Sequence, residues 1–203
     1  MINIEHLEAW GFKHAIRGMR NPMNSWAISD SEEKDGKIIV GERDLALMNK
    51  LYKAGTSHRK FMRQIFISMD IVAPLYWWKE FDTYKVGVTA NSCSTMHMIH
   101  TSVLDLDDFS YEHLNDPAYG DLCDTIYRLN TEIKHYNETH NKEDWWNIIQ
   151  LLPTSYNQRR TVTMSYENAA SIIDQRRNHK LDEWVIFTQI LRTLPYMEEI
   201  ISD

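Results

Sequence analysis

An α/β fold of the α+β type, with more helix than strand, is expected for this chain. Its 203 residues and 24.1 kDa suffice for one sizeable core, and 43% of the residues are hydrophobic. Seven glycines and five prolines are too few for a loop-dominated chain. The sequence shows no internal repeat and no Gly/Ser linker, so we expect residues 1–203 to form a single domain.

The N-terminal half alternates between strand-like and helical patterns. Residues 2–20 begin as a short strand and continue with FKHAIRGMR to a turn at Asn21-Pro22, and the polar segment 29–37 reads as an exposed loop. A helix is predicted for residues 42–54, where apolar side chains recur on one face. Residues 61–73 are strand-like, although RKFMRQ is also compatible with a helical start, and Pro74 suits the first turn of a helix to Phe81.

The C-terminal half is mostly helical. After a polar region at 107–115, Asp116-Pro117 opens the clearest helix, with apolar residues at Leu122, Ile126, Leu129 and Ile133. A helix from about Glu143 to Leu152 is stopped by Pro153. TVTMSY is a short predicted strand, and ENAASIIDQRR and LDEWVIFTQILRTL are predicted helices.

The composition narrows the classes of partner. The formal charge of −7 disfavours a protein that tracks nucleic-acid phosphates, whereas a pocket for a small phosphorylated ligand needs only two or three cations. Cys93 and Cys123 stand in neither a disulfide framework nor a metal-type spacing, which fits a reducing, cytoplasmic setting. We see no signal-peptide pattern, and the longest apolar run, IVAPLYWW, is too short to span a membrane.

Two stretches resemble the flavin-dependent thymidylate synthase (ThyX) family. Residues 73–97 run from an apolar segment through an Ala-Pro and an aromatic helix into a Ser-rich loop. Residues 151–184 contain a Leu-Pro, the TVTMSY strand, a helix ending in Arg-Arg and then a Trp, in the order that the family has.

The ThyX signature itself is largely rewritten. Laid without gaps from the Ala-Pro, the family's Arg-Gln-aromatic falls on residues 79–81, its Arg-His-Arg on 83–85 and its following Ser on Val88. Cationic character at Lys79 and Lys85 and aromatic character at Phe81 carry across, while Thr83 and Tyr84 depart from the motif.

The resemblance implies a ThyX-like central sheet with helices and a long helical segment. It also implies a homotetramer that binds FAD and a dUMP-like nucleotide and methylates the pyrimidine at C5, with NADPH and methylenetetrahydrofolate as co-substrates. The implied flavin contacts fall on His58, Gln64, Lys79, Tyr84, Lys85 and Asn168. The implied nucleotide contacts fall on Asn91, Ser92, Cys93, Ser94, Arg176 and Arg177.

The cationic residues also have a plainer interpretation. Lys79 and Lys85 either share a phosphate site or are ordinary solvated lysines. Arg176, Arg177 and His179 either clamp a phosphate or complement the dipole of a helix C-terminus.

The loop and the aromatic pair leave similar alternatives. The run 89–95 either binds a phosphate or a pyrimidine edge, or caps the helix that begins near Met96. Cys93 reads better as a small buried side chain than as a nucleophile. Trp77 and Trp78 are adjacent, so we expect one to face the core and the other a ligand or a second chain.

The histidines are weaker signals. His97 and His100 have the i, i+3 spacing of a metal pair, but the sequence offers no third ligand at helical or hairpin spacing. His135 and His140 lie in a polar segment and read as surface residues.

Two functions of different classes follow. The first is a divergent flavin-dependent thymidylate synthase-like enzyme, which the order of elements around residues 152–184 favours. The second is a nucleotide-binding or assembly protein that kept the fold and lost the flavin, which the rewritten residues 83–88 favour. A modified-pyrimidine enzyme is a third interpretation that no residue singles out.

Overall fold

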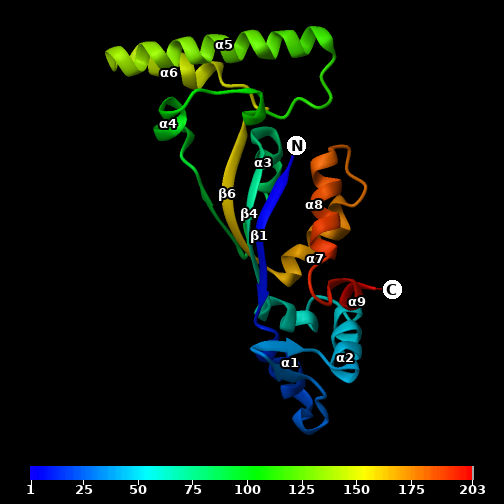
Figure 1. Ribbon diagram of the computed structural model, residues 1–203. Helices are drawn as coiled ribbons and strands as arrows, with labels where there is room; N and C mark the ends of the chain where they lie inside the picture. Colours follow the sequence, from blue (N-terminus) through cyan, green and yellow to red (C-terminus); the bar gives the residue numbers. More distant parts are fainter. Residues whose placement is uncertain (203) are drawn as a thin grey trace. The chain divides into compact units, whose positions relative to one another are not determined.

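The computed structural model (Figure 1) describes residues 1–202. The chain divides into two compact units. Unit 1 consists of residues 1–4, 70–83 and 90–161, and unit 2 of residues 5–69, 84–89 and the remainder from Val162. Strands β1 (Asn3–Trp10), β4 (Phe66–Pro74), β6 (Asn157–Ser165) and β5 (Val88–Ser92) form a four-stranded sheet in the order β1-β4-β6-β5. The mixture of helices with this sheet confirms the α+β prediction.

Unit 1 is built around the long helix α5 (Asp116–Thr139), which begins where the sequence places it. The Asn115 side chain accepts a hydrogen bond from the Ala118 amide at 3.1 Å, and a proline occupies the first turn. Helix α6 (Lys142–Leu151) packs along α5 (Figure 1). The predicted apolar face of α5 joins the core of this unit, which consists of Ile99, Leu104, Phe109, Leu122, Ile126, Leu129, Ile133 and Ile148.

Four shorter elements complete the helical part of unit 1. Helix α3 (Leu75–Phe81) follows β4 directly, as Pro74 predicts. Helix α4 (Thr95–Met98) and the 3-10 turn Ile99–Thr101 follow β5, and a further 3-10 turn covers Leu106–Asp108.

Unit 2 contains the remaining helices. Helix α2 (Glu42–Lys53) matches its predicted range, whereas α1 (Phe12–Arg20) was not predicted as a helix. The 3-10 turns Asn21–Met23, Trp26–Ile28 and Arg59–Gln64 also belong to this unit. Helices α7 (Tyr166–Arg176) and α8 (Asp182–Arg192) pack together, and α9 (Met197–Ile201) follows them (Figure 1).

A buried ion pair fastens α1 to α2 within unit 2. Arg20 Nε donates to Asp44 Oδ1 at 2.6 Å, and both side chains are almost fully buried. The other carboxylate oxygen accepts hydrogen bonds from the hydroxyls of Ser29 and Ser31. Burial by itself raises the pKa of Asp44, but the bonds from Ser29, Ser31 and Arg20 outweigh it and hold the pKa below its ordinary value.

Three local predictions are wrong. The polar segment 29–37 is a hairpin rather than a loop, because Gly36 (φ +74°) makes the tight turn that pairs β2 (Glu32–Lys34) with β3 (Lys37–Ile39). The Ser-rich run 89–95 starts as strand β5 instead of a loop. Strand β6 begins earlier than TVTMSY, and Tyr166 already belongs to α7 because Ser165 caps that helix.

The expectation for the tryptophan pair is also wrong, because both rings are fully buried. Trp77 and Trp78 meet edge to face with ring centroids 4.9 Å apart, and Phe81 stacks on Trp77 at 5.1 Å. A helix as short as α3 buries more than one face, so neighbouring side chains both lie in the interior. Within residues 1–202, every helix is too short or too polar to cross a membrane.

Candidate functional site

Gln158 organises the polar part of unit 1. It lies on β6, and its Nε2 donates to the carbonyl of Cys93 and to Oγ1 of Thr95, both at 3.0 Å. The Cys93 amide donates in turn to the carbonyl of Arg159 at 2.9 Å. The run from Asn91 to the start of α4 is thus held against β6 by side-chain and backbone bonds.

Gln158 also connects β6 to the aromatic helix α3. Its carbonyl accepts from Trp78 Nε1 at 2.9 Å, and its Oε1 accepts from Arg160 Nε at 2.9 Å. The Arg160 guanidinium lies over the Trp78 ring, 4.3 Å from the centroid, and pairs with Asp82 at 2.7 Å. Arg160 therefore serves to fix α3 and is largely occupied by these contacts.

The predicted nucleotide contacts of unit 1 are four consecutive exposed residues, 91–94, which we call the exposed ridge. Asn91, Ser92, Cys93 and Ser94 are all exposed. Ser94 is the N-cap residue of α4, but its side chain makes no capping bond. Helix capping therefore does not account for the polar side chains of this run. Cys93 is exposed, which contradicts its interpretation as a small buried side chain.

Lys79, a predicted flavin contact, lies in the same unit on the exposed side of α3. Its neighbours in the helix, Trp77 and Trp78, point into the interior instead. The exposed lysine is compatible with either of its two interpretations.

Unit 2 brings Tyr84 and Arg176 together in an aromatic cluster. Arg176 Nε donates to the Tyr84 hydroxyl at 2.9 Å, and the guanidinium carbon lies 4.6 Å from the Trp184 ring centroid and 5.6 Å from that of Tyr84. The Tyr84 hydroxyl donates to Gln175 Oε1 at 3.2 Å. Arg176 is half-buried and held on two rings, so it acts first as a structural residue.

Arg177 differs from its neighbour, because it is exposed at the C-cap of α7. His179 turns back to the chain, and its Nδ1 accepts a hydrogen bond from the Leu181 amide at 3.2 Å. Of the three predicted phosphate ligands at this helix end, Arg177 is thus the one that faces solvent.

Asn168 positions the segment that carries Lys85. Its Nδ2 donates to the carbonyl of Val86 at 2.8 Å, and its Oδ1 accepts from the Ser165 hydroxyl at 2.6 Å. Gly87 adopts φ +74° beside it, and a Cβ at this glycine would lie 3.1 Å from Asn168 Oδ1. Lys85 is exposed next to this anchored turn.

The other two predicted flavin contacts flank the 3-10 turn Arg59–Gln64. His58 and Gln64 are both exposed, and the Gln64 side chain lies against Gly18 of α1. Between them, Arg59 and Arg63 both pair with Glu167 on α7. The hydrogen bond from Arg63 is the main cause that holds the pKa of Glu167 below its ordinary value.

The structure thus collects Tyr84, Lys85, Asn168 and Arg176 on one segment and one helix of unit 2, and it holds the Asn91–Ser94 run, at the end of β5, against Gln158 of β6 in unit 1. Sequence reasoning missed the anchoring role of Gln158, because a single glutamine on a strand carries no spacing signal. It also missed that Arg176 packs on two aromatic rings while the adjacent Arg177 faces solvent.

Comparisons with known proteins give a fold-level match. No family model and no curated protein matches the sequence. Two structures of the flavin-dependent thymidylate synthase ThyX from Helicobacter pylori with FAD and dUMP match with a TM-score of 0.71. Their sequence identities are 14% and 13%, covering 98% and 99% of this chain and 97% of each of theirs. The UMP/dUMP methylase PolB from Streptomyces cacaoi, bound with 5-Br dUMP, matches with a TM-score of 0.64 and 10% identity over 100% of this chain and 95% of that one.

Proposed function

We propose that this chain is a divergent flavin-dependent thymidylate synthase-like protein that binds FAD and a pyrimidine deoxynucleotide and methylates dUMP at C5. The observation that carries the proposal is the match, along nearly the full length of both chains, to structures solved with FAD and dUMP. A second neighbour, a dUMP methylase, supports the same class of substrate. At this identity the match establishes the fold, and the activity is the inference that we draw from it.

The exposed residues of unit 2 fit a ligand with phosphate groups. Lys85 and Arg177 offer cations in solvent, and the Val86–Gly87 turn offers backbone that a ligand can approach closely. Asn168 fixes this turn, and Arg176 fixes Tyr84 beside it. When bound and reduced, the flavin would supply the hydride for the methyl group. Tyr84, Lys85 and Asn168 would bind and orient the flavin, and Arg177 would bind the phosphate of the nucleotide.

The exposed ridge of unit 1 fits the pyrimidine nucleotide. Asn91, Ser92 and Ser94 provide neutral donors and acceptors of the kind that read a base edge or a sugar, and Gln158 holds their backbone in place. We propose that methylenetetrahydrofolate and NADPH are co-substrates, and that the protein is a cytoplasmic homotetramer acting as one domain per chain.

A nucleotide-binding protein without flavin is the second candidate, and one observation favours it. The Tyr84 hydroxyl, where the ThyX motif has a histidine, is engaged by Arg176 and Gln175 of the same chain. Each charge-assisted contact that the rewritten motif lacks is worth roughly 1.5–3 kcal/mol. Losing several of them would therefore lower the affinity for FAD by orders of magnitude.

The visible absorption spectrum separates the two candidates. Protein purified without added cofactor, and again after FAD titration and desalting, should show oxidised-flavin bands at about one flavin per chain if the first proposal holds. A Lys85→Met variant should retain less flavin, whereas Lys180→Met, an exposed lysine after α7, serves as the matched control.

Calorimetry with dUMP, dCMP and dTMP completes the test. A colourless protein that binds one of these nucleotides supports the flavin-free candidate. A colourless protein that binds none of them refutes both.

A further inference from the structure

The structure contains a hollow in unit 1 that the proposed function does not use. Its volume is about 320 Å³, near the lower limit of small-molecule sites. It lies where α4 and its following 3-10 turn meet the C-terminal part of α5 and the start of α6. The principal side chains that line it are His97, His100, His140, Lys142, Tyr136 and Trp145.

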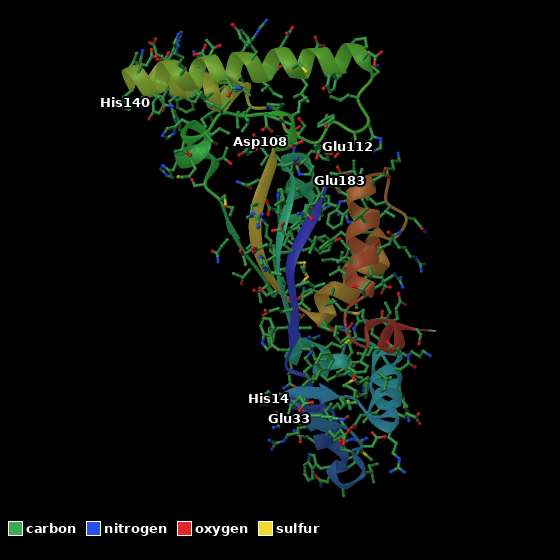
Figure 2. The ribbon with its side chains drawn as sticks, viewed as in Figure 1. His14, Glu33, Asp108, Glu112, His140 and Glu183 are labelled. Atoms are coloured by element: carbon green, nitrogen blue, oxygen red, sulfur yellow. The ribbon has the colours of Figure 1, made fainter. Side chains whose placement is uncertain are left out.

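The walls of this hollow are fixed by specific contacts. The Tyr136 ring meets the rings of both His100 and His140 edge to face, with centroids 4.9 and 5.8 Å away. Trp145 Nε1 donates to the carbonyl of Met96 at 3.2 Å, which holds α4 against α6. His140 lies at the C-terminal end of α5 (Figure 2).

His140 reaches the hollow through an unusual backbone conformation. It ends α5 with φ 53° and ψ 26°, the left-handed region, and its amide donates to the Tyr136 carbonyl at 2.7 Å. This conformation reverses the chain so that Lys142 follows at the first position of α6. His140 is exposed, as the sequence predicts, and it also lines the hollow.

His100 supplies a second, independent observation. Its Nδ1 is buried, and within residues 1–202 no hydrogen-bond partner accompanies it. Buried polar atoms without a partner are uncommon in folded proteins, and each one calls for an explanation such as a bound water or ion. The backbone carbonyl of His100 accepts a hydrogen bond from Asn137 Nδ2 at 3.0 Å, which holds this backbone against α5, and the His100 ring packs on Tyr136.

The arrangement of the histidines argues against a single metal ion. Ligands of one transition-metal ion lie about 2 Å from it and hence about 3–4 Å from one another. In the described part of the chain, the group whose ligand atoms all lie within 4.8 Å of one another is Glu132, His135 and Asp144, outside the hollow. The three histidines are too far apart for one ion and suit a larger ligand.

The charges of the residues that line the hollow indicate which class of ligand it binds. A chain with a net charge of −7 places three histidines and one lysine around this hollow, and none of the lining residues is acidic. Imidazole and ammonium N–H groups bind phosphate or carboxylate oxygens, and the Tyr136 and Trp145 rings offer flat surfaces for a ring. We propose that this hollow binds a small anion that carries a phosphate or carboxylate group on a flat ring.

Calorimetry of the flavin-free protein tests the proposal, with phenyl phosphate, benzoate, inorganic phosphate and phenol as probes. We expect phenyl phosphate or benzoate to bind at least tenfold more tightly than inorganic phosphate or phenol, because only the first two combine the charge with the ring. A higher affinity for phenyl phosphate than for benzoate would identify phosphate as the preferred group, and the reverse order of affinities would identify carboxylate. Equal affinity for all four probes, or no binding, would overturn the proposal.

Variants assign the binding to this hollow. Lys142→Met keeps the side-chain stem, and His140→Asn keeps a residue that tolerates the left-handed conformation. Each variant should lower the affinity for the tighter-binding probe about tenfold, which is the effect expected from losing one charge-assisted contact. Lys134→Met and His135→Asn, on an exposed part of α5 outside the hollow, should not change the affinity.

A variant of His100 separates binding from folding. His100→Phe keeps a ring against Tyr136 and removes the unpartnered nitrogen, so thermal unfolding should not occur at a lower temperature while the tighter probe binds at least tenfold more weakly. Unchanged affinity in this variant and in Lys142→Met would place the anion elsewhere and overturn the proposal. None of the probes is a nucleotide, so this result does not depend on whether the chain binds FAD or dUMP.

Discussion

Arg176 and Arg177 are adjacent in the sequence, yet the structure assigns them different effects when each is replaced by methionine. The Arg176 guanidinium lies over the rings of Tyr84 and Trp184 and donates to the Tyr84 hydroxyl. Arg177 is exposed at the end of α7. Methionine retains an apolar stem of similar length, so the substitution mainly removes the charged group.

The expected magnitudes follow from these contacts. Two cation–π contacts at a half-buried site contribute about 0.5–1 kcal/mol each, and the hydrogen bond about 1 kcal/mol, so Arg176→Met should lower the free energy of unfolding by roughly 2–3 kcal/mol. Arg177→Met removes an exposed side chain and should change the free energy of unfolding by no more than about 0.5 kcal/mol. If Arg177 binds the nucleotide phosphate, its loss should lower the affinity for dUMP roughly tenfold to a hundredfold.

Urea unfolding followed by tryptophan fluorescence, together with calorimetry with dUMP, measures both quantities. Arg176→Lys is the control for the planar guanidinium, because an ammonium retains the charge but fits the two rings and the hydroxyl less well. An Arg176→Met protein as stable as the wild type would refute the structural role. An Arg177→Met protein that binds dUMP normally would refute the phosphate contact without affecting the first result.

Three further predictions concern the fold and the exposed ridge. Asp44→Ala leaves a buried arginine unpaired and should lower the free energy of unfolding by about 3–5 kcal/mol in urea, against less than about 1 kcal/mol for Glu33→Gln in an exposed ion pair. Because the folded-state pKa of Asp44 is lowered from 3.8, its contribution is present above that pH and is lost as the pH falls through the lower value, which acid titration of wild type and variant should show. Gln158→Leu removes the bond to the Cys93 carbonyl, so Cys93 should react faster with a thiol reagent in a Cys123→Ser background; an unchanged rate would contradict the anchoring role. Gly87→Ala should cost about 1–2 kcal/mol in urea, since its φ is +74° and the new Cβ meets Asn168, and a neutral effect would mean that the turn relaxes.

The apolar periodicity of the sequence was sufficient to locate most helices. Residues three and four apart share one helix face, so Leu122, Ile126, Leu129 and Ile133 predict α5 whatever lies beside it. Pro74 and Pro153 likewise mark helix boundaries through local backbone geometry. The order of elements, and with it the resemblance to ThyX, depends on these local signals alone.

Composition did not locate the short elements at 29–37 and 89–95. Both segments are polar, which is typical of loops, but strand pairing satisfies their backbone groups. The first pairs locally, with residues 37–39 directly after its turn, whereas the second pairs with the distant strand β6. The same limit applies to Trp77 and Trp78, since packing against α3 on more than one face places both rings in the interior.

The sequence by itself determined the mixed helix–strand class, the helix boundaries and the acidic charge, because these follow from neighbours along the chain and from residue counts. Only the tertiary structure decided which polar residues meet. Gln158 is 65 positions from Cys93 and anchors it, and Arg176 is 92 positions from the tyrosine that holds it. His140 joins His97 and His100 at one hollow because α5 returns its far end to α4. Such meetings depend on packing between distant segments, and no local spacing of residues encodes them.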